Sequence, residues 1–340
     1  MNILVVRLGA LGDVVHTIPA VAALRATMPD ARIDWLVEAR HRAMVGLVPA
    51  VDRVVTLDGR TIAAWVDTIR RLRETTYDVA LDFQGLMKSA VFARASGAHR
   101  VAGFSIWHLR EKSARPFYSE TDGAGSHSEG DATVHVIQKN LHLLQVLGIR
   151  TSRVEFPLTR VPSRALDQIR QRLGAVPFAV VNPGAAWPNK RWAPQRFAEI
   201  ATFLRDVRGL ASIVLWGPGE QPLAQSIVDA AGGAAHLSPA TDIPDLVEMS
   251  RAAALIVSGD TGPLHIAAAV GTPAVALYGP TDPNRNGPWD PNDVKLSRFD
   301  ACDCHYRRAC RRAEWCLDSI SVAEVTAGIQ QRLTSSASHG

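Results

Sequence analysis

The fold is decided by the stretch Ile3-Leu4-Val5-Val6-Arg7-Leu8-Gly9-Ala10-Leu11-Gly12-Asp13 and by its counterpart, Ala254-Leu255-Ile256-Val257-Ser258-Gly259-Asp260-Thr261-Gly262-Pro263. Each begins with an apolar run, which predicts a buried strand, and continues through glycines and an aspartate into a helical pattern. Such a turn exposes backbone N–H groups at the start of a helix, at the carboxyl edge of a parallel sheet, where anions and small ligands bind. The chain is therefore expected to have two ligand-binding edges that face each other across a cleft.

Strands and helices are expected to alternate along the whole chain. The predicted strands are residues 2–6, 32–37, 53–57, 78–82, 100–103, 178–182, 212–216, 254–258 and 273–278. The predicted helices are residues 14–27, 62–75, 86–95, 132–147, 163–173, 194–207, 221–231, 243–251 and 263–269. Strands that are apolar throughout imply parallel sheets covered on both faces. The sequence thus predicts an α/β protein with two doubly wound, Rossmann-like domains.

The boundary between the domains is expected between Leu147 and Ser163. Gly148 is placed to end a helix, residues 156–162 form an extended connector, and Ser163 is placed to cap the next helix. A polar, glycine-rich stretch at residues 119–130 predicts a mobile surface loop. We expect an N-terminal domain over 1–157, a C-terminal domain over 158–320 and a last helix over 321–334 that packs back on the N-terminal domain.

Composition and charge exclude several classes of protein. The 340 residues suffice for two cores, and 47% apolar with 21% charged residues is usual for a globular enzyme. A net charge of +4 is too small to indicate nucleic-acid binding. Residues 88–118 are locally basic, which suits an anionic substrate or a lipid surface, although a solvated helix face would give the same pattern.

Targeting signals are also missing from the sequence as it stands. No apolar run approaches the roughly 20 residues of a membrane-spanning helix. The run from Ile3 to Val6 is interrupted by Arg7 and fits a first strand, not a signal peptide. We therefore expect a cytoplasmic protein.

Asp13 is the candidate catalytic base. Its turn has the pattern G-x-x-G-D and not the G-x-G-x-x-G of dinucleotide-binding enzymes, which disfavours hydride transfer. Gly9 and Gly12 allow a sharp bend and the close approach of a ligand, and a position in the first helical turn favours the carboxylate form. An ionised Asp13 could accept a proton from a sugar hydroxyl, whereas the alternative is a carboxylate that only caps the helix.

The second turn predicts an oxyanion site. Pro263 fits the start of a helix, where its missing N–H does no harm. The N–H groups of Thr261 and Gly262, together with the Thr261 hydroxyl, are expected to bind a phosphate, and His265 to donate a further hydrogen bond to a leaving diphosphate. Asp260 is expected to cap the helix or to hold a ribose hydroxyl.

Two further loops after predicted strands are expected to complete this site. Residues 182–192 carry Lys190, which can reach a diphosphate as a point charge. Residues 217–220 end at Glu220, which can accept hydrogen bonds from ribose hydroxyls. The alternatives are a solvent-exposed lysine and a carboxylate at a helix start.

Several motifs resemble, in order, those of the lipopolysaccharide heptosyltransferase I family within glycosyltransferase family 9. The motifs are Arg7-Leu8-Gly9-Ala10-Leu11-Gly12-Asp13, Asp34-Trp35-Leu36-Val37-Glu38, Asp82-Phe83-Gln84-Gly85-Leu86-Met87-Lys88-Ser89, Arg110-Glu111, Lys190-Arg191-Trp192, Gly259-Asp260-Thr261-Gly262-Pro263-Leu264-His265 and Tyr278-Gly279-Pro280-Thr281-Asp282-Pro283. The resemblance implies a GT-B fold and inverting transfer of L-glycero-D-manno-heptose from ADP-heptose to the Kdo of Kdo-lipid A. It also implies peripheral contact with the cytoplasmic face of the inner membrane. No metal, other cofactor or nucleic acid is expected.

The resemblance also implies roles for single residues. Asp13 becomes the base that deprotonates the acceptor hydroxyl. The donor contacts become Ala185, Ala186, Lys190, Glu220, Asp260, Thr261, Gly262 and His265, and the acceptor contacts Gly12, Lys88 and Arg110. Because Ala185 and Ala186 stand where relatives often offer hydroxyls, that loop is expected to bind through backbone N–H groups.

The cysteines depart from the family pattern. Cys302, Cys304, Cys310 and Cys316 have the spacing C-x-C-x5-C-x5-C, which matches no standard zinc motif. Disulfides are unusual in a reducing compartment, so reduced thiols are favoured, while bound iron or zinc stays an alternative.

Three other functions stay open at this point. One is a heptosyltransferase with another acceptor, either the second core heptose or a protein hydroxyl. The second is a nucleotide-sugar epimerase of the same architecture. The third is a catalytically silent binding protein.

Overall fold

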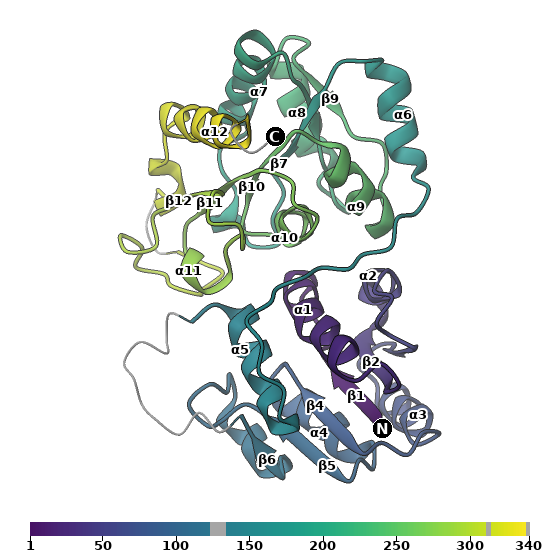
Figure 1. Cartoon of the computed structure of the whole chain (residues 1–340). Helices are drawn as coiled ribbons and strands as arrows, with labels where there is room; N and C mark the ends of the chain where they lie inside the picture. The colour runs from purple at the N-terminus through teal and green to yellow at the C-terminus, as the bar shows by residue number, and fades with distance from the viewer. Residues whose placement is uncertain (123–133, 311–313, 338–340) are drawn as a thin grey trace. The chain divides into compact units, whose positions relative to one another are not determined.

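The computed structural model describes residues 1–122, 134–310 and 314–337, and in these ranges the chain forms two six-stranded sheets that are parallel throughout. Each sheet belongs to one of two compact units, Met1–Thr159 and Arg160–Gly340 (Figure 1). Helices connect the strands in both units. The prediction of an α/β, doubly wound fold is therefore confirmed.

The first unit has the strand order β3-β2-β1-β4-β5-β6. The strands are β1 (Asn2–Val6), β2 (Arg32–Glu38), β3 (Arg53–Leu57), β4 (Val79–Asp82), β5 (Arg100–Gly103) and β6 (Glu120–Thr121). The helices are α1 (Leu11–Thr27), α2 (Arg42–Gly46), α3 (Ile62–Leu72), α4 (Met87–Ala95) and α5 (Val136–Leu143). The central strand β1 is buried over Ile3–Val6, because helices cover both faces of a parallel sheet.

The second unit has the strand order β12-β11-β10-β7-β8-β9. Its strands are β7 (Phe178–Asn182), β8 (Ala211–Val214), β9 (Ala235–Leu237), β10 (Leu255–Gly259), β11 (Ala274–Tyr278) and β12 (Val294–Ser297). Its helices are α6 (Arg164–Leu173), α7 (Pro194–Arg208), α8 (Gln221–Ala230), α9 (Ile243–Ala252), α10 (Gly262–Ala269), α11 (Pro283–Asn286) and α12 (Val322–Ala337). Apolar residues of α7, α8 and α12 share one core with the sheet, and those of α6, α9 and α10 share another.

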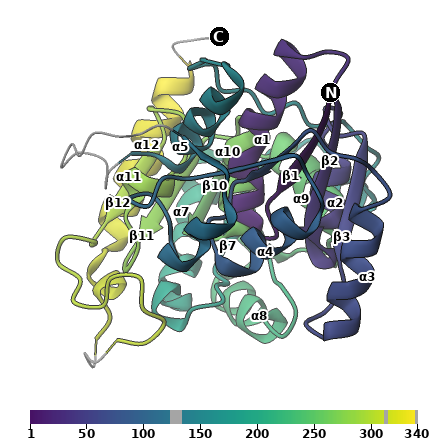
Figure 2. The same ribbon diagram turned by 90° about the horizontal axis from the view of Figure 1, so that it is seen from below.

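The last helix, α12, belongs to the core that it shares with α7 and α8 in the second unit. Val325 and Ile329 of α12 are fully buried in the cluster that also holds residues of α7 and α8. In Figures 1 and 2, α12 lies beside β11 and β12, with which it is in contact. The apolar face of this helix is thus used within its own unit, and its suggested return to the N-terminal domain stays a prediction.

Three expectations about local structure need correction. The stretch predicted as a mobile loop begins with β6, which pairs with β5, while residues 123–130 lie outside the described residues. The helix predicted over 132–147 is α5 followed by a 3-10 turn at Leu144–Leu147, and Gly148 ends it in the left-handed conformation. Strands β9 and β12 were not predicted, since each is a short, half-buried strand at a sheet edge.

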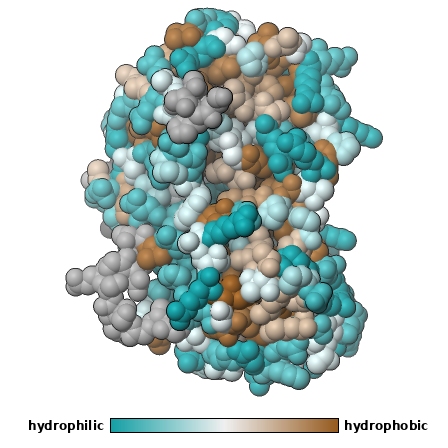
Figure 3. All heavy atoms as spheres, viewed as in Figure 1, coloured by the Kyte–Doolittle hydropathy of each residue, from teal (hydrophilic) through white to brown (hydrophobic). Residues whose placement is uncertain are grey.

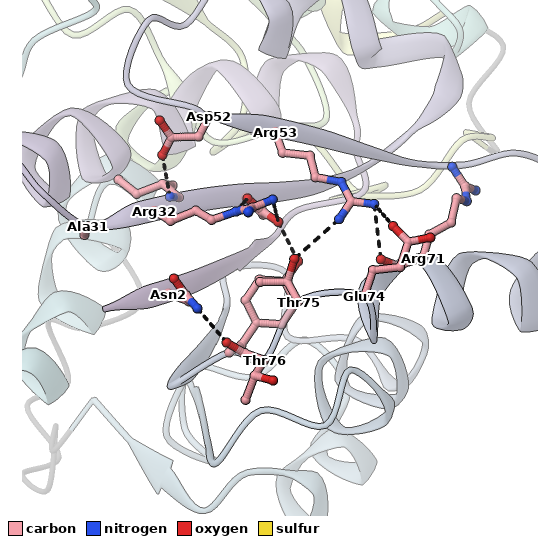
Figure 4. A network of polar contacts seen from close by, with 12 residues as sticks. Asn2, Ala31, Arg32, Asp52, Arg53, Arg71, Glu74, Thr75 and Thr76 are labelled. Carbon is pink, nitrogen blue, oxygen red and sulfur yellow. Dashed lines mark hydrogen bonds and ion pairs between the residues drawn. The ribbon is translucent and has the colours of Figure 1, made fainter.

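The amino edge of the first sheet carries a polar network (Figure 4). The Asn2 side chain donates to the Thr76 carbonyl at 2.8 Å, and Arg53 reaches Glu74 at 2.5 Å and the Thr75 hydroxyl at 3.4 Å. These contacts tie the starts of β1 and β3 to the turn before β4. Because ligands bind at the opposite, carboxyl edge in such folds, we assign this network a structural role.

Figure 3 shows a mainly hydrophilic exterior on the face that it presents, with hydrophobic surface appearing in separate areas. Among the helices of the described residues, none combines the length and the hydrophobicity that crossing a bilayer requires.

Candidate active site

Asp13 lies in the first turn of α1, just beyond the carboxyl end of β1. Its Oδ1 is 2.7 Å from Nη2 of Arg7, and its Oδ2 accepts a hydrogen bond from the N–H of Ala10 at 3.2 Å. The Arg7 guanidinium is almost fully buried and donates to the carbonyl of Phe83, which follows β4. The Asp13 side chain remains 28% exposed, so the carboxylate is fixed in orientation and still within reach of a ligand.

A buried histidine packs against the same turn. A Cβ added to Gly9 would lie 3.0 Å from Nε2 of His41, so glycine is what lets the turn approach the imidazole. Burial and the charge of Arg40 lower the pKa of His41 to about 4. His41 is therefore neutral at pH 7, where it packs against the turn that carries Asp13.

This histidine should contribute to acid sensitivity. His41 is protonated with a pKa of 6.5 in the unfolded chain but only with a pKa of about 4 in the folded chain. The stability that neutral His41 contributes is therefore fully present above pH 6.5 and is lost as the pH falls toward 4. Between pH 7 and pH 5, the free energy of unfolding should fall by about 1 kcal/mol more in the wild type than in His41→Phe, a figure that allows for solvent screening. Urea unfolding of both proteins at both pH values measures this difference. Equal losses in the two proteins would contradict the assignment.

The predicted acceptor contacts lie at this carboxyl edge. Gly12 is in the first turn of α1, and Lys88 is in the first turn of α4, where its Nζ is 3.0 Å from Oε1 of Glu38 at the end of β2. Burial opposes ionisation of Glu38, but the hydrogen bond and charge of Lys88 outweigh it and lower the pKa of that carboxyl. Arg110 is exposed in the segment after β5. The structure thus brings the predicted residues of the first unit to one edge of the sheet.

In the second unit, Asp260 is the centre of a buried polar cluster just after β10. Its Oδ2 lies 2.5 Å from Nζ of Lys190 and accepts a hydrogen bond from the Thr281 hydroxyl at 2.7 Å. Its Oδ1 lies 3.2 Å from Nε2 of His265 and accepts from the Asn286 amide at 2.9 Å. One carboxylate therefore organises side chains from the loops after β7 and β11, from α11 and from α10.

The charge of this cluster follows from its contacts. Burial alone would raise the pKa of Asp260, but the hydrogen bond from His265 and the charge of Lys190 outweigh burial and lower the pKa well below its usual range. Asp260 is therefore ionised and holds Lys190 and His265 in place. The expectation that it caps the helix is not met, because its hydrogen-bond partners are these side chains and not the first N–H groups of α10.

The start of α10 is suited to an anion. Thr261 is the N-cap residue, and its side chain makes no capping hydrogen bond. The Thr261 hydroxyl accepts from the Asn182 amide at 2.7 Å, and its contact with the oxyanion stays a prediction. The N–H groups at the first turn, beginning with Gly262, are left for a ligand, and the positive end of the helix favours a negative one.

The remaining residues that are predicted to contact the donor lie in the loops after β7 and β8. The Glu220 carboxylate accepts from the N–H of Gly217 at 3.1 Å and lies 3.4 Å from Nη2 of Arg191. The Ala185 carbonyl accepts from Nε of Arg191 at 2.8 Å, and Ala186 is exposed. Arg191 therefore connects these two loops, and binding through the N–H groups of Ala185 and Ala186 stays a prediction.

Gly184 provides a test of Glu220. A Cβ at this position would lie 2.1 Å from Oε2 of Glu220, so Gly184→Ala must displace the carboxylate. If Glu220 binds the donor, the substitution should weaken ADP binding about tenfold, the effect of about one lost hydrogen bond to a charged group. Titration calorimetry with ADP measures this. The matched control is Gly46→Ala, where a Cβ has open space, and an unchanged affinity in Gly184→Ala would remove Glu220 from the site.

The four cysteines pack together in one cluster. Cys302, Cys304 and Cys316 are buried, Cys310 packs against them, and none forms a disulfide. The Sγ atoms of Cys302 and Cys304 are 3.4 Å apart, and burial raises the pKa of the Cys304 thiol to about 12. Across the described residues, no group of three or more His, Cys, Asp or Glu side chains is arranged to hold a metal ion.

The segment that carries the cysteines contacts the loops that hold Lys190 and Thr281. The Asn189 amide, next to Lys190, donates to Sγ of Cys304 at 3.6 Å and to the Arg307 carbonyl at 2.9 Å. The Tyr306 N–H donates to the carbonyl of Pro280, the residue before Thr281, at 2.8 Å. The segment that carries the thiols is thus hydrogen-bonded to the loops that supply Lys190 and Thr281.

Two doubly wound α/β units, each built on a parallel sheet with strand-to-helix turns at its carboxyl edge, are the architecture of GT-B glycosyltransferases. The model of glycosyltransferase family 9 (heptosyltransferase) matches residues 65–315, and the chain belongs to this family. The chain is thus an enzyme, a heptosyltransferase of lipopolysaccharide core synthesis, as the sequence motifs predicted. Of the alternatives, the transferase is favoured over the epimerase and the silent binding protein.

Individual relatives agree with the family assignment. Lipopolysaccharide heptosyltransferase 1 of Pseudomonas aeruginosa is 28% identical over 91% of this chain and 87% of its own length. Lipopolysaccharide heptosyltransferase 3 of Escherichia coli is 26% identical over 96% of this chain and 97% of its own. The structure of E. coli heptosyltransferase WaaC with ADP-2-deoxy-2-fluoro heptose shares the fold, with a TM-score of 0.75, 23% identity, and coverage of 97% of this chain and 99% of that one.

Proposed function

We propose that this enzyme transfers L-glycero-D-manno-heptose from ADP-heptose to the Kdo of Kdo-lipid A, with inversion at the anomeric carbon. The observation that carries the proposal is the uncapped start of α10 beside Lys190, which Asp260 holds in place. This is a site for a diphosphate, and the fold is that of an enzyme solved with an ADP-heptose analogue. The similarity to a heptosyltransferase 1 over most of the chain supports Kdo-lipid A as the acceptor.

The donor side is proposed to stabilise the leaving group. Lys190 carries three N–H donors, of which the carboxylate and the carbonyl of Asp260 accept two, so the third can reach a diphosphate oxygen. The N–H groups of the first turn of α10 and the imidazole of His265 are proposed to add further hydrogen bonds. Glu220 is proposed to accept from the ribose hydroxyls. As the bond from the anomeric carbon to the diphosphate oxygen breaks, these donors stabilise the charge that collects on ADP.

The acceptor side is proposed to supply the base. The acceptor oxygen attacks the anomeric carbon while Asp13 takes the hydroxyl proton, so a new C–O bond forms as the old one breaks. In-line attack places the base and the leaving diphosphate on opposite sides of the anomeric carbon, which accounts for inversion. Gly12, Lys88 and Arg110 are proposed to contact the acceptor, whose carboxylate and phosphate groups suit the two cations. The reaction is proposed to occur at the cytoplasmic face of the inner membrane.

The acceptor can be tested with a defined panel. The similarity to a heptosyltransferase 3 makes a core that already carries heptose the second candidate. Transfer from ADP-heptose should be measured with Kdo-lipid A lacking heptose, with the same lipid already carrying one heptose, with a protein that offers free hydroxyls, and without acceptor. We expect product only from the heptose-free lipid. Product only from the heptose-bearing lipid, or only from the protein, would replace the proposed acceptor, and turnover of the nucleotide-sugar without acceptor would favour an epimerase.

A further inference from the structure

A short turn after β5 presents two large apolar side chains to the exterior. The Ser105 carbonyl accepts hydrogen bonds from the N–H groups of His108 at 2.9 Å and of Leu109 at 3.1 Å, which closes the turn. Its base is fixed by buried Asp122, which accepts from the Ser105 N–H at 2.9 Å and lies 3.2 Å from Nδ1 of His108. Leu109 is buried and anchors the other end. These hydrogen bonds hold the base of the turn in place.

The tip consists of Ile106 and Trp107, which are 39% and 59% exposed. Polar residues and glycine usually occupy such a position, because a tip faces water. A third exposed apolar residue, Met87 at the start of α4, lies beside the segment that follows, since its N–H donates to the Glu111 carboxylate at 2.7 Å. The start of α4 thus adds an exposed apolar side chain next to the segment that follows the turn.

Cationic side chains flank this tip. Arg110 and Lys112 are exposed in the segment that follows the turn, and Lys88 neighbours Met87. The carboxylate of Glu111 is engaged by the N–H of Met87 at the start of α4. Tryptophan favours the interface between water and lipid, and lysine and arginine are attracted to anionic headgroups. An apolar tip with a basic rim combines both properties and fits a lipid surface.

We propose that the turn 105–109 docks on an anionic lipid bilayer, with Ile106 and Trp107 entering the interfacial layer and Arg110 and Lys112 contacting the headgroups. The proposal rests on the proposed function in one respect, because a lipid-borne acceptor makes a bilayer the expected partner. The turn follows β5, which is parallel to β1, so it lies at the same carboxyl edge as Asp13. A sugar carried by a docked lipid surface would thus meet the edge of the sheet that holds the base.

Binding of the full chain to vesicles tests this proposal without any donor or acceptor. The vesicles are phosphatidylcholine with and without phosphatidylglycerol, and cosedimentation measures the bound fraction. We expect the wild type to bind the anionic vesicles and to be released by high salt, because the headgroup contacts are electrostatic. The double variant Ile106→Ser with Trp107→Ser should bind at least about tenfold more weakly, and Lys112→Gln should bind more weakly than the wild type. The matched control is Val207→Ser, an exposed apolar residue of the second unit.

The outcomes separate this inference from the proposed function. Equal vesicle binding by the wild type and the double variant, with thermal unfolding showing both folded, would overturn the docking proposal. The proposal would also be overturned if Val207→Ser weakened vesicle binding as much as the double variant does. With an acceptor that is water-soluble and lacks acyl chains, the double variant should turn over like the wild type, whereas with acceptor embedded in vesicles it should be slower. Absence of transfer to every acceptor would refute the proposed function and leave the vesicle result unaffected.

Discussion

Replacing Asp13 with Asn is expected to lower kcat by about 10²–10⁴-fold, the usual contribution of a general base. Asn keeps the size of the side chain, and its amide oxygen can still accept from Arg7 or from the Ala10 N–H. It cannot take the proton of the acceptor hydroxyl. ADP affinity should stay within about twofold, because Asp13 is assigned no contact with the diphosphate. Steady-state kinetics and titration with ADP measure the two quantities.

The matched control for this prediction is Asp30→Asn, which changes an exposed aspartate of the same unit. It should leave both kcat and ADP affinity unchanged. If Asp13→Asn lowers kcat by less than about tenfold, Asp13 is a helix cap and not a base. If it weakens ADP binding as much as it slows turnover, the residue contacts the donor and the assignment of the two units must be exchanged.

The second large effect is expected for Asp260→Asn. This substitution removes the charge that faces Lys190 and His265 in a buried cluster, and breaking a buried pair from one side typically costs about 3–5 kcal/mol. We expect a loss of about 3 kcal/mol in the free energy of unfolding at pH 7, together with an ADP affinity at least about tenfold weaker. Urea unfolding and calorimetry measure the two effects.

A double-mutant cycle separates the lost charge from a general loss of packing. Removing both charges, in Asp260→Asn with Lys190→Met, should recover part of the stability that Asp260→Asn loses, because no uncompensated lysine then remains. The double variant should still bind ADP weakly, since Lys190 is proposed to contact the diphosphate. Additive losses of stability in the cycle would contradict the coupling of Asp260 to Lys190.

The fold was predictable because the central strands of both sheets are mainly apolar and buried, and glycines lie at their ends or in the turns that follow them. The stretches 2–6 and 178–182 match β1 and β7 to the residue. The turn from a buried parallel strand into the next helix must lie at the carboxyl edge, so the positions of Asp13 and Asp260 were predictable from the sequence. The edge strands β6, β9 and β12 were not, because they are short or half-buried and carry no apolar run.

The partners of the site residues were not predictable in the same way. Arg7 was visible only as part of a motif, and its ion pair with Asp13 depends on how the turn folds back over β1. Thr281 and Asn286 reach Asp260 from the loop and the short helix α11 that follow the neighbouring strand β11. Spacing along the chain carries no signal for such contacts. His41 likewise meets Gly9 only through the pairing of β1 with β2.

The most direct test of the account is a crystal structure of the enzyme with ADP-2-deoxy-2-fluoro heptose bound. We predict that the diphosphate accepts hydrogen bonds from the N–H groups of the first turn of α10 and from Nζ of Lys190, with the ribose at Glu220. A diphosphate bound instead at the turn that carries Gly9 and Asp13 would contradict the account, because the proposed base would then hold the leaving group.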